Sequence, residues 1–518
     1  MFKGRWKEAL LLLLQHERAE KGRMADHVLV FPFPLQGHVN SMLKLAELLS
    51  LAGLHVTFLN TDHNLRLLAR HSVAYARLVR SPRFRFRSIP DGFEDERRRS
   101  VSRLFDLYAS LQTRSVGPYK DLLLELQRRD EEGHGGWPVL TCVIADGIMT
   151  FAADVASEVG VPAMFFRTIS ACSIWSYLCI PELLQTGELP FPDDADLDEP
   201  IRNVPGMEGF LRRRDLSIFC RNAKNSSDPS LRLVSTATAD SVRARALILN
   251  TFESLEPCAL EHIRSRCPVT YCIGPLHALL RTYYRLTSGS DHEEVRSTAS
   301  ASLWHEDRSC MSWLDAQPRR SVVYVSFGSL TVMSPEDFTE FWLGLVNSGQ
   351  WFLWVVRRDL VDGKELGEGA AAAAAGETAA QLEKATRERG YLVEWVPQEE
   401  VLGHPAVGCF LTHSGWNSTL ESLVAGVPML CWPFFADQQT NSRFVGEVWR
   451  VGLDMKDMHG RDIVEKMVRE MMEGNKAEEL RTSAAKMAEM ARDSVSSTGG
   501  SSFMEFEKLI QDIRSLRP

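Results

Sequence analysis

Short runs of apolar residues alternate with segments of helical periodicity along most of the chain. In the first half the apolar runs predict five strands, over residues 27–33, 55–60, 139–146, 161–166 and 246–250. Two of the intervening segments predict helices, over residues 39–52 and 151–159. Met42, Leu45 and Leu49 share one face of the first of these helices, as a core-facing helix requires. Strands that alternate with helices in this way predict an α/β fold with parallel sheets.

The same alternation restarts in the second half of the chain. Its apolar runs predict strands over residues 322–327, 351–356, 391–395, 409–412 and 428–432. After the first of them Ser334 is placed to cap a helix, with Pro335 at its first position and Asp337 completing a capping-box pattern. The sequence therefore predicts two doubly wound, Rossmann-like domains that face each other across a cleft.

Five segments follow from this pattern. We expect a peripheral leader over residues 1–23, a first Rossmann-like domain over 24–275, an interdomain linker over 276–312, a second Rossmann-like domain over 313–495, and a C-terminal helix over 496–518 that packs back on the first domain. Met24 directly precedes the first strand and is our candidate for the functional start. The linker is assigned because its residues are mostly polar and lack sustained periodicity. An alanine run over residues 370–375 is expected in a surface loop.

Composition and charge narrow the class of protein. The 518 residues are 44% hydrophobic and 25% charged, which is typical of a globular chain. A net charge of −9, with acids and bases mixed, argues against nucleic acid or an anionic membrane as the main partner. The ten cysteines form no C-x-x-C pair, so we expect neither a disulfide framework nor a zinc ribbon, and a cytoplasmic location. The apolar run over residues 9–14 is too short to span a membrane.

Polar and aromatic side chains gather at three strand ends of the second half, within residues 395–398, 412–418 and 432–438. In doubly wound sheets ligands bind outside the carboxyl ends of the strands. The helix that opens at 413–418 would present free N–H groups to a diphosphate, and Gly415 allows close backbone approach. Taken alone, Trp395 is more often a packed core aromatic, Glu421 a solvated helix residue, and His413 either a ligand contact or a structural residue. Their coincidence at one sheet edge favours a nucleotide-sugar site.

Residues 395–438 together resemble the plant secondary-product glycosyltransferase signature, and the resemblance to that family extends from residue 27 to the C-terminus. The segments 33–38, 324–329 and 436–441 are similar to the branch of cyanohydrin and iridoid glucosyltransferases. This resemblance implies a GT-B fold and inverting, metal-independent transfer from a UDP-sugar, so that no cofactor or metal is expected beyond the UDP-glucose co-substrate.

The resemblance also implies a role for each signature residue. Trp395 would stack on uracil, whose edge the Val396 backbone would reach, and Gln398 and Glu421 would hold the ribose. The phosphates would be bound at Gly415 and by His413, Asn417, Ser418 and Ser329. Trp416, Asp437 and Gln438 would hold the sugar, and a glutamine at position 438 is associated with glucose.

An inverting transfer needs a base beside the acceptor hydroxyl, and histidine is well suited near neutral pH. His38 follows the first strand at a helix start, where a helix cap is an equal alternative on the sequence alone. The resemblance identifies it as the catalytic base and Asp146, at the end of the 139–146 strand, as the carboxylate that orients it. Asp146 could also cap the helix that follows. Thr168 is a candidate contact to the sugar.

Several alternatives remain open at this point. The donor could be UDP-xylose, UDP-rhamnose or UDP-galactose, or the chain could be a non-catalytic UDP-sugar or small-ligand binding protein. A lumenal glucuronosyltransferase of the animal type is disfavoured, because such a protein would have a signal peptide and a C-terminal membrane helix, and this sequence predicts neither. We expect a monomer with a small lipophilic acceptor, whose pocket would lie near Phe93, Phe105, Trp175 and Tyr177. Terpenoid, cyanohydrin, phenolic and hormone acceptors all fit.

Overall fold

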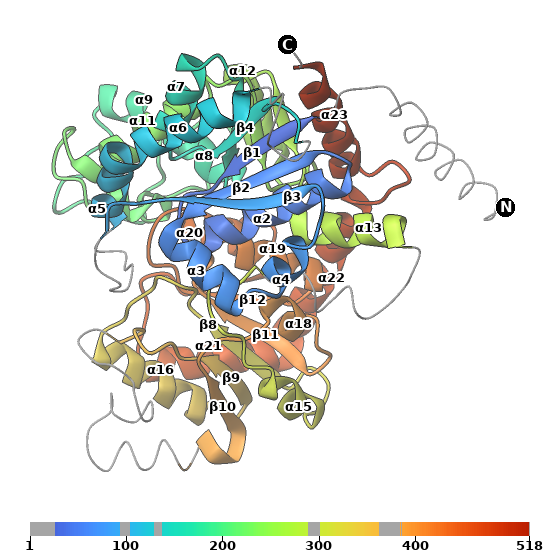
Figure 1. The fold of residues 1–518 in the computed structure, drawn as a ribbon. Coiled ribbons are helices and arrows are strands. Elements are labelled where there is room, and N and C mark those ends of the chain that lie inside the picture. Colours follow the sequence, from blue (N-terminus) through green and yellow to red (C-terminus); the bar gives the residue numbers. More distant parts are fainter. Residues whose placement is uncertain are drawn as a thin grey trace.

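The structure is a computed structural model that describes residues 26–93, 104–128, 137–288, 301–361, 384 and 386–516. Two parallel sheets lie one above the other in Figure 1, each flanked by helices, which confirms the predicted α/β class. The leader over residues 1–23 and the alanine run over 370–375 lie outside the described residues.

The first sheet has seven strands. From edge to edge they are β3 (Phe84–Ile89), β2 (His55–Thr61), β1 (His27–Phe31), β4 (Cys142–Asp146), β5 (Ala163–Arg167), β6 (Leu247–Leu249) and β7 (Thr270–Cys272). Its helices are α2 (Gln36–Leu51), α3 (Asp62–His71), α4 (Val73–Leu78), α5 (Leu104–Ser110), α6 (Val116–Gln127), α7 (Phe151–Glu158), α8 (Ala171–Leu178), α9 (Ile180–Gln185), α10 (Ile218–Arg221), α11 (Pro229–Ser241), α12 (Pro257–Arg266) and α13 (Leu276–Ser288). All strand pairs are parallel, so their carboxyl ends share one edge.

The second sheet has six parallel strands. Their order is β10 (Gly390–Val393), β9 (Trp351–Val355), β8 (Val322–Ser326), β11 (Val407–Thr412), β12 (Met429–Cys431) and β13 (Gly452–Asp454). The remaining helices are α15 (Ser309–Asp315), α16 (Pro335–Asn347), α18 (Gln398–Leu402), α19 (Trp416–Ala425), α20 (Gln438–Arg443), α21 (Arg461–Met472), α22 (Gly474–Ser494) and α23 (Ser501–Ser515). Short π or 3₁₀ turns lie at Leu111–Ser115, Arg213–Asp215 and Phe444–Val448. Ser334 caps α16 as predicted, because its Oγ accepts from the Asp337 N–H at 3.0 Å.

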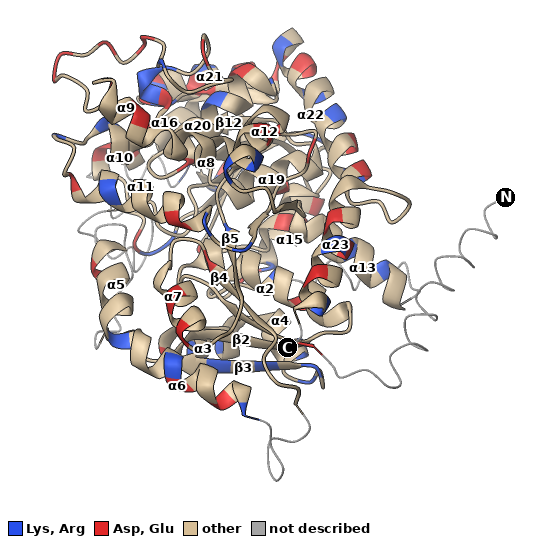
Figure 2. Cartoon of the chain, turned by 90° about the horizontal axis from the view of Figure 1, so that it is seen from above, with Lys and Arg blue, Asp and Glu red and all other residues tan. Residues whose placement is uncertain are grey.

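Three strands were not predicted from the sequence. β3 carries Arg85 and Arg87 between its apolar residues, and Figure 2 shows it as a basic strand at the margin of the first domain. Edge strands of this kind lack the apolar run that marks a buried strand. β7 and β13 have only three residues each, too few for a periodic signal.

The expected linker over residues 276–312 is wrong in its first part. Leu276–Ser288 forms α13, which packs along α2 and buries Leu279, Leu280 and Tyr283 in the core beneath the first sheet. The chain returns to the same core at its end, since Phe506 of α23 packs on Tyr283 and Asp512 accepts a hydrogen bond from Tyr271 of β7. Figure 1 shows α23 beside the first sheet. Both α13 and α23 therefore belong to the core of the first domain.

Candidate active site

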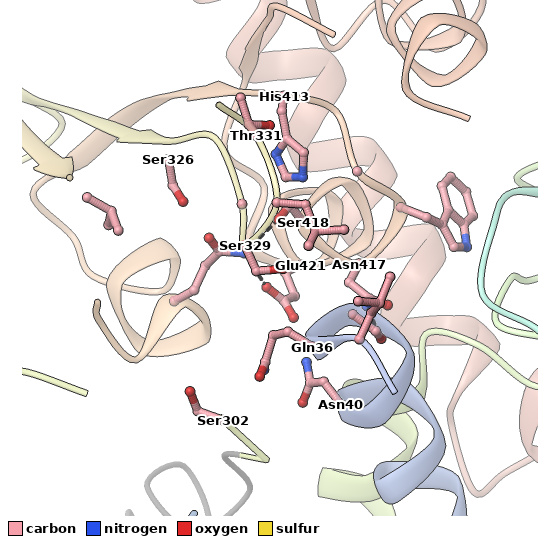
Figure 3. A pocket seen from close by; sticks show the side chains of 18 of the residues that line it. Gln36, Asn40, Ser302, Ser326, Ser329, Thr331, His413, Asn417, Ser418 and Glu421 are labelled. Carbon is pink, nitrogen blue, oxygen red and sulfur yellow. Dashed lines mark hydrogen bonds between the residues drawn. The ribbon is translucent and has the colours of Figure 1, made fainter. Parts of the chain in front are cut away.

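A cleft lies between the carboxyl edges of the two sheets and collects the residues singled out in the sequence (Figure 3). It is lined by His38, Thr168, Ser329, Trp395, Val396, Gln398, His413, Gly415, Trp416, Asn417, Ser418, Glu421, Asp437 and Gln438. Asp146 does not line the cleft and lies directly behind His38. Loops from both sheets therefore form one site, as expected for doubly wound domains that face each other.

His38 and Asp146 form a hydrogen-bonded pair. His38 lies in the first turn of α2, and its Nδ1 is 2.6 Å from Asp146 Oδ2, at the end of the neighbouring strand β4. The Asp146 carboxylate is buried and also accepts from the backbone N–H groups of Phe33 at 3.3 Å and Ile148 at 3.2 Å. Thr168 Oγ1 lies 3.1 Å from the same His38 nitrogen. The carboxylate therefore assigns the proton to Nδ1 and leaves Nε2 as the proton acceptor.

Three loops at the edge of the second sheet turn through left-handed backbone. Gly328 after β8 has φ 72°, Ser414 after β11 has φ 63°, and Ala436 after β12 has φ 58°. Non-glycine residues adopt this conformation rarely, and strained backbone of this kind concentrates at ligand sites. Helix α19 then begins at Trp416 with no side-chain cap on its first turn. Its free N–H groups and helix dipole suit a phosphate group.

The His413 ring packs closely against Gly328, in the loop after β8, and against Gly415 of its own loop. A Cβ on Gly415 would approach His413 Nε2 to 2.5 Å, and a Cβ on Gly328 would collide with the same ring. Burial, with the nearby charge of Arg357, lowers the pKa of His413 to about 4. The ring is therefore neutral at physiological pH, with one N–H to donate. The two glycines are required by this close approach, because any side chain there would displace the imidazole.

Gln398, at the start of α18, and Glu421, in α19, meet in the cleft. Gln398 Nε2 donates to Glu421 Oε2 at 2.7 Å and to Ser418 Oγ at 2.9 Å, while Tyr324 donates to Gln398 Oε1 at 3.0 Å. Burial raises the pKa of Glu421 to about 7. The Trp395 ring borders this region, tilted against Trp304 with a centroid separation of 5.9 Å. The arrangement offers an aromatic face and a carboxylate to one ligand.

Asp437 and Gln438 occupy the start of α20. Burial raises the pKa of Asp437 to about 6, although Asn441 Nδ2 donates to its Oδ2 at 2.8 Å. Gln438 Oε1 accepts from the backbone of Phe434 at 2.8 Å and of Phe435 at 3.0 Å. These bonds orient the Gln438 amide so that its NH₂ group is the end left to donate to a ligand.

Trp416 contributes differently from the other signature residues. Its side chain is buried, and its indole N–H donates to the Asn250 carbonyl of the first domain at 2.8 Å. A contact from Trp416 to a sugar would therefore come from its backbone N–H at the start of α19, while its ring joins the two domains.

Five further polar residues line the cleft that were not predicted from the sequence and are labelled in Figure 3, namely Gln36, Asn40, Ser302, Ser326 and Thr331. Ser326 is the last residue of β8, so the strand-end rule that identified the other loops also applies to it. Gln36 and Asn40 flank His38 in the first turns of α2. Ser302 had no such signal, because it lies in an irregular segment.

The expected acceptor-pocket residues do not line this cleft. Trp175 stacks on His262 with ring centroids 4.6 Å apart, and its indole N–H donates to the Pro205 carbonyl at 2.8 Å. Tyr177 is buried in the same core. Both belong to α8, whose residues are buried on nearly all sides, and their place in the acceptor pocket stays a prediction. Phe105 instead lines a separate hollow beside α11.

Metal-ligand groups, membrane-spanning helices and disulfides bear on other functions. Within residues 26–93, 104–128, 137–288, 301–361 and 386–516, no group of three or more His, Cys, Asp or Glu side chains is arranged to hold a metal ion. No helix in those ranges is long and apolar enough to cross a bilayer. All ten cysteines are free thiols.

Comparison with known proteins identifies close relatives. Residues 299–488 match the family described as UDP-glucoronosyl and UDP-glucosyl transferase. The chain is 48% identical over 499 residues to a 7-deoxyloganetic acid glucosyltransferase of Catharanthus roseus, an alignment that covers 96% of this chain and 99% of that protein. It is 50% identical over 490 residues to the myricetin 3-O-rhamnoside 1,2-glucosyltransferase UGT709G2 of Crocosmia x crocosmiiflora, covering 95% and 96% of the two chains. The solved structure of Os79 from O. sativa in complex with UDP superposes with a TM-score of 0.75 at 28% identity, over 94% of this chain and all of that one.

Proposed function

The chain belongs to the plant UDP-glycosyltransferase family, in the branch that contains iridoid glucosyltransferases, and on that premise we propose the reaction it carries out. It transfers glucose from UDP-glucose to a hydroxyl group of a small lipophilic acceptor and releases UDP. The observation that carries this proposal is the convergence of the His38–Asp146 pair and the signature loops on one cleft.

The proposed step needs one base and one leaving group. His38 Nε2 removes the proton of the acceptor hydroxyl while its oxygen forms a bond to the anomeric carbon. The bond from that carbon to the UDP oxygen breaks on the opposite face, so an α-linked donor gives a β-glucoside. Asp146 holds the imidazole proton of His38 on Nδ1 and stabilises the imidazolium that forms. The proton then passes from His38 to solvent.

Donor recognition is proposed for the signature residues. Trp395 stacks on uracil, which the Val396 backbone also contacts, and Gln398 and Glu421 hold the ribose hydroxyls. The free N–H groups of α19 and the side chains of Ser329, His413, Asn417 and Ser418 bind the diphosphate. Asp437 and Gln438 hold the glucose, with Thr168 beside the base.

The acceptor class is proposed from the relatives. Two of them, 48% and 50% identical to this chain, are named for an iridoid acid and for a flavonoid rhamnoside. We propose an iridoid-type or phenolic acceptor, with the reaction in the cytoplasm on a monomeric enzyme and without a metal. A non-catalytic binding protein on the same fold would have no need of the aligned His38–Asp146 pair, which favours the enzyme.

Purified full-length protein tests this proposal. We would incubate it with UDP-glucose and a panel that includes 7-deoxyloganetic acid and myricetin 3-O-rhamnoside, with and without EDTA, and measure UDP release and glucoside by mass spectrometry. We expect turnover that survives EDTA and falls about 10²–10⁴-fold in His38→Ala. His459→Ala removes an exposed histidine outside the cleft and should leave turnover unchanged. Binding of UDP-glucose without glycosylation of any acceptor, with other UDP-sugars also inactive, would favour the binding-protein alternative.

A further inference from the structure

Helix α2 carries more than the base. One stripe of this helix, formed by Gly37, Ser41 and Lys44, faces the donor-binding helices of the second domain. Ser41 Oγ donates to Asn417 Oδ1 at 2.7 Å, and Asn417 Nδ2 donates to the Gly37 carbonyl at 2.8 Å. Residues spaced by four and three positions lie on one side of a helix, so the stripe is continuous. His38 therefore lies on a helix that is docked directly on the donor site.

Lys44 forms the far end of this stripe and is buried. Its Nζ lies 2.5 Å from Glu399 Oε1, in α18, and 3.9 Å from Glu421 Oε1, in α19. Arg281 of α13 contacts the other oxygen of Glu399 at 2.7 Å. Glu399 is thus paired with two cationic side chains, Lys44 and Arg281. For Glu421 the nearest cationic side chain of the first domain is Lys44. Lys44 and the Glu421 side chain are each only 6% exposed, so water screens their attraction weakly.

The charge states agree with this geometry. Burial alone would lower the pKa of Lys44, but the charges of Glu399 and Glu421 outweigh it and raise the pKa. For Glu421 burial raises the pKa, and Lys44 opposes that rise. An ionised carboxylate accepts stronger hydrogen bonds from hydroxyl groups than a protonated one does. Removing the ammonium would therefore weaken Glu421 as an acceptor for two hydroxyls.

We propose that Lys44 is a positioning residue for donor binding, a first-domain ammonium that holds the ribose-binding Glu421 as an oriented carboxylate and docks the base-bearing helix on the donor site. This inference rests on the proposed donor site. Lys44 lies outside the signature segment, yet it would strengthen UDP-sugar binding through the contact of Glu421 with the ribose hydroxyls.

Calorimetry with two nucleotides tests it. UDP and 2′,3′-dideoxy-UDP differ only in the ribose hydroxyls, so their affinity ratio isolates the Glu421 contact. A hydrogen bond to a charged group contributes more to binding than one to a neutral group, by roughly the equivalent of a tenfold change in affinity. We therefore expect Lys44→Met to weaken the binding of UDP about tenfold and that of the dideoxy nucleotide less than twofold. Lys120→Met, which removes the surface partner of Glu158, is the matched control and should change neither.

Each outcome separates this inference from the proposed function. If the wild-type protein binds neither nucleotide, the proposed donor site fails. If it prefers UDP but Lys44→Met weakens both nucleotides equally, or neither, Lys44 has no role through the ribose and the inference is overturned. Should Lys44→Met fail to fold, Lys44→Gln provides the same comparison with a polar end that can still donate to the buried carboxylates. In steady-state kinetics Lys44→Met should raise the KM for UDP-glucose by a larger factor than it lowers kcat, since Lys44 acts on donor binding and the His38 base is retained.

Discussion

Replacing Asp146 with asparagine isolates the electrostatic share of the His38–Asp146 pair. The substitution keeps the size of the side chain, and its remaining oxygen can still accept from the Ile148 N–H that now bonds to Oδ1 at 3.2 Å. What is lost is the negative charge 2.6 Å from His38 Nδ1. Asparagine can also donate to that nitrogen, which would place the imidazole proton on Nε2 and block it as a base.

The size of the effect follows from the charges that develop in the reaction. When His38 takes up the acceptor proton, an imidazolium forms beside a carboxylate that is 2% exposed. Two unit charges about 4 Å apart attract by about 4 kcal/mol at an effective dielectric constant near 20. Every 1.36 kcal/mol of barrier is about tenfold in rate, so kcat should fall about 10³-fold in Asp146→Asn. The KM for UDP-glucose should stay within about threefold, because Asp146 does not line the cleft.

Initial rates of UDP release with the best acceptor of the panel measure both constants. Asp154→Asn, an exposed residue in the helix that follows β4, is the control and should keep full activity. Thermal unfolding of each variant shows whether the fold is retained. A folded Asp146→Asn enzyme with kcat within a few-fold of wild type would refute the role of this carboxylate. A raised KM with unchanged kcat would instead move Asp146 into donor binding.

Three further predictions concern the donor site. Trp395→Ala should weaken UDP binding by about 5- to 150-fold in calorimetry, because one base–aromatic stack is worth about 1–3 kcal/mol. Trp395→Phe should keep most of the affinity, since it retains an aromatic face. Equal affinity in the wild type and both variants would exclude stacking. UDP-glucose binding should weaken as the pH falls through about 7, since Glu421 then becomes protonated and accepts less strongly from the ribose hydroxyls. UDP-glucose suits this test because its diphosphate does not titrate near neutral pH. An affinity that does not change with pH in calorimetry would contradict the prediction. Gly415→Ala should abolish most donor binding, because the added Cβ would meet His413 Nε2 at 2.5 Å. Gly117→Ala, where a Cβ meets no atom within 4 Å, is the control and should bind the donor normally. Intact binding by Gly415→Ala would show that the His413 position is not needed.

The sequence by itself determined the fold class and most of the donor loops. Strand ends can be identified from hydrophobic runs, and parallel strands bring their carboxyl ends to one edge whatever the details of packing. Polar residues at those ends, from Trp395 to Gln438, could therefore be assigned to one site before any coordinates. The helix start at His38 and the strand end at Asp146 followed from the same rule, although 108 positions separate them.

Only the tertiary structure decided what covers each face. Trp175 and Tyr177 were expected in the acceptor pocket, but other elements of the first domain close over α8 and bury them. α13 was expected to be part of a linker because residues 276–312 are mostly polar and lack sustained periodicity. Its apolar side is explained only by its packing against α2. Lys44 lies on a helix with an apolar face, and nothing local distinguishes it from a solvated lysine. Its partners Glu399 and Glu421 follow more than 350 positions later, in the other domain. Periodicity records whether a face is buried, but the identity of the covering element depends on long-range packing, which no local pattern encodes.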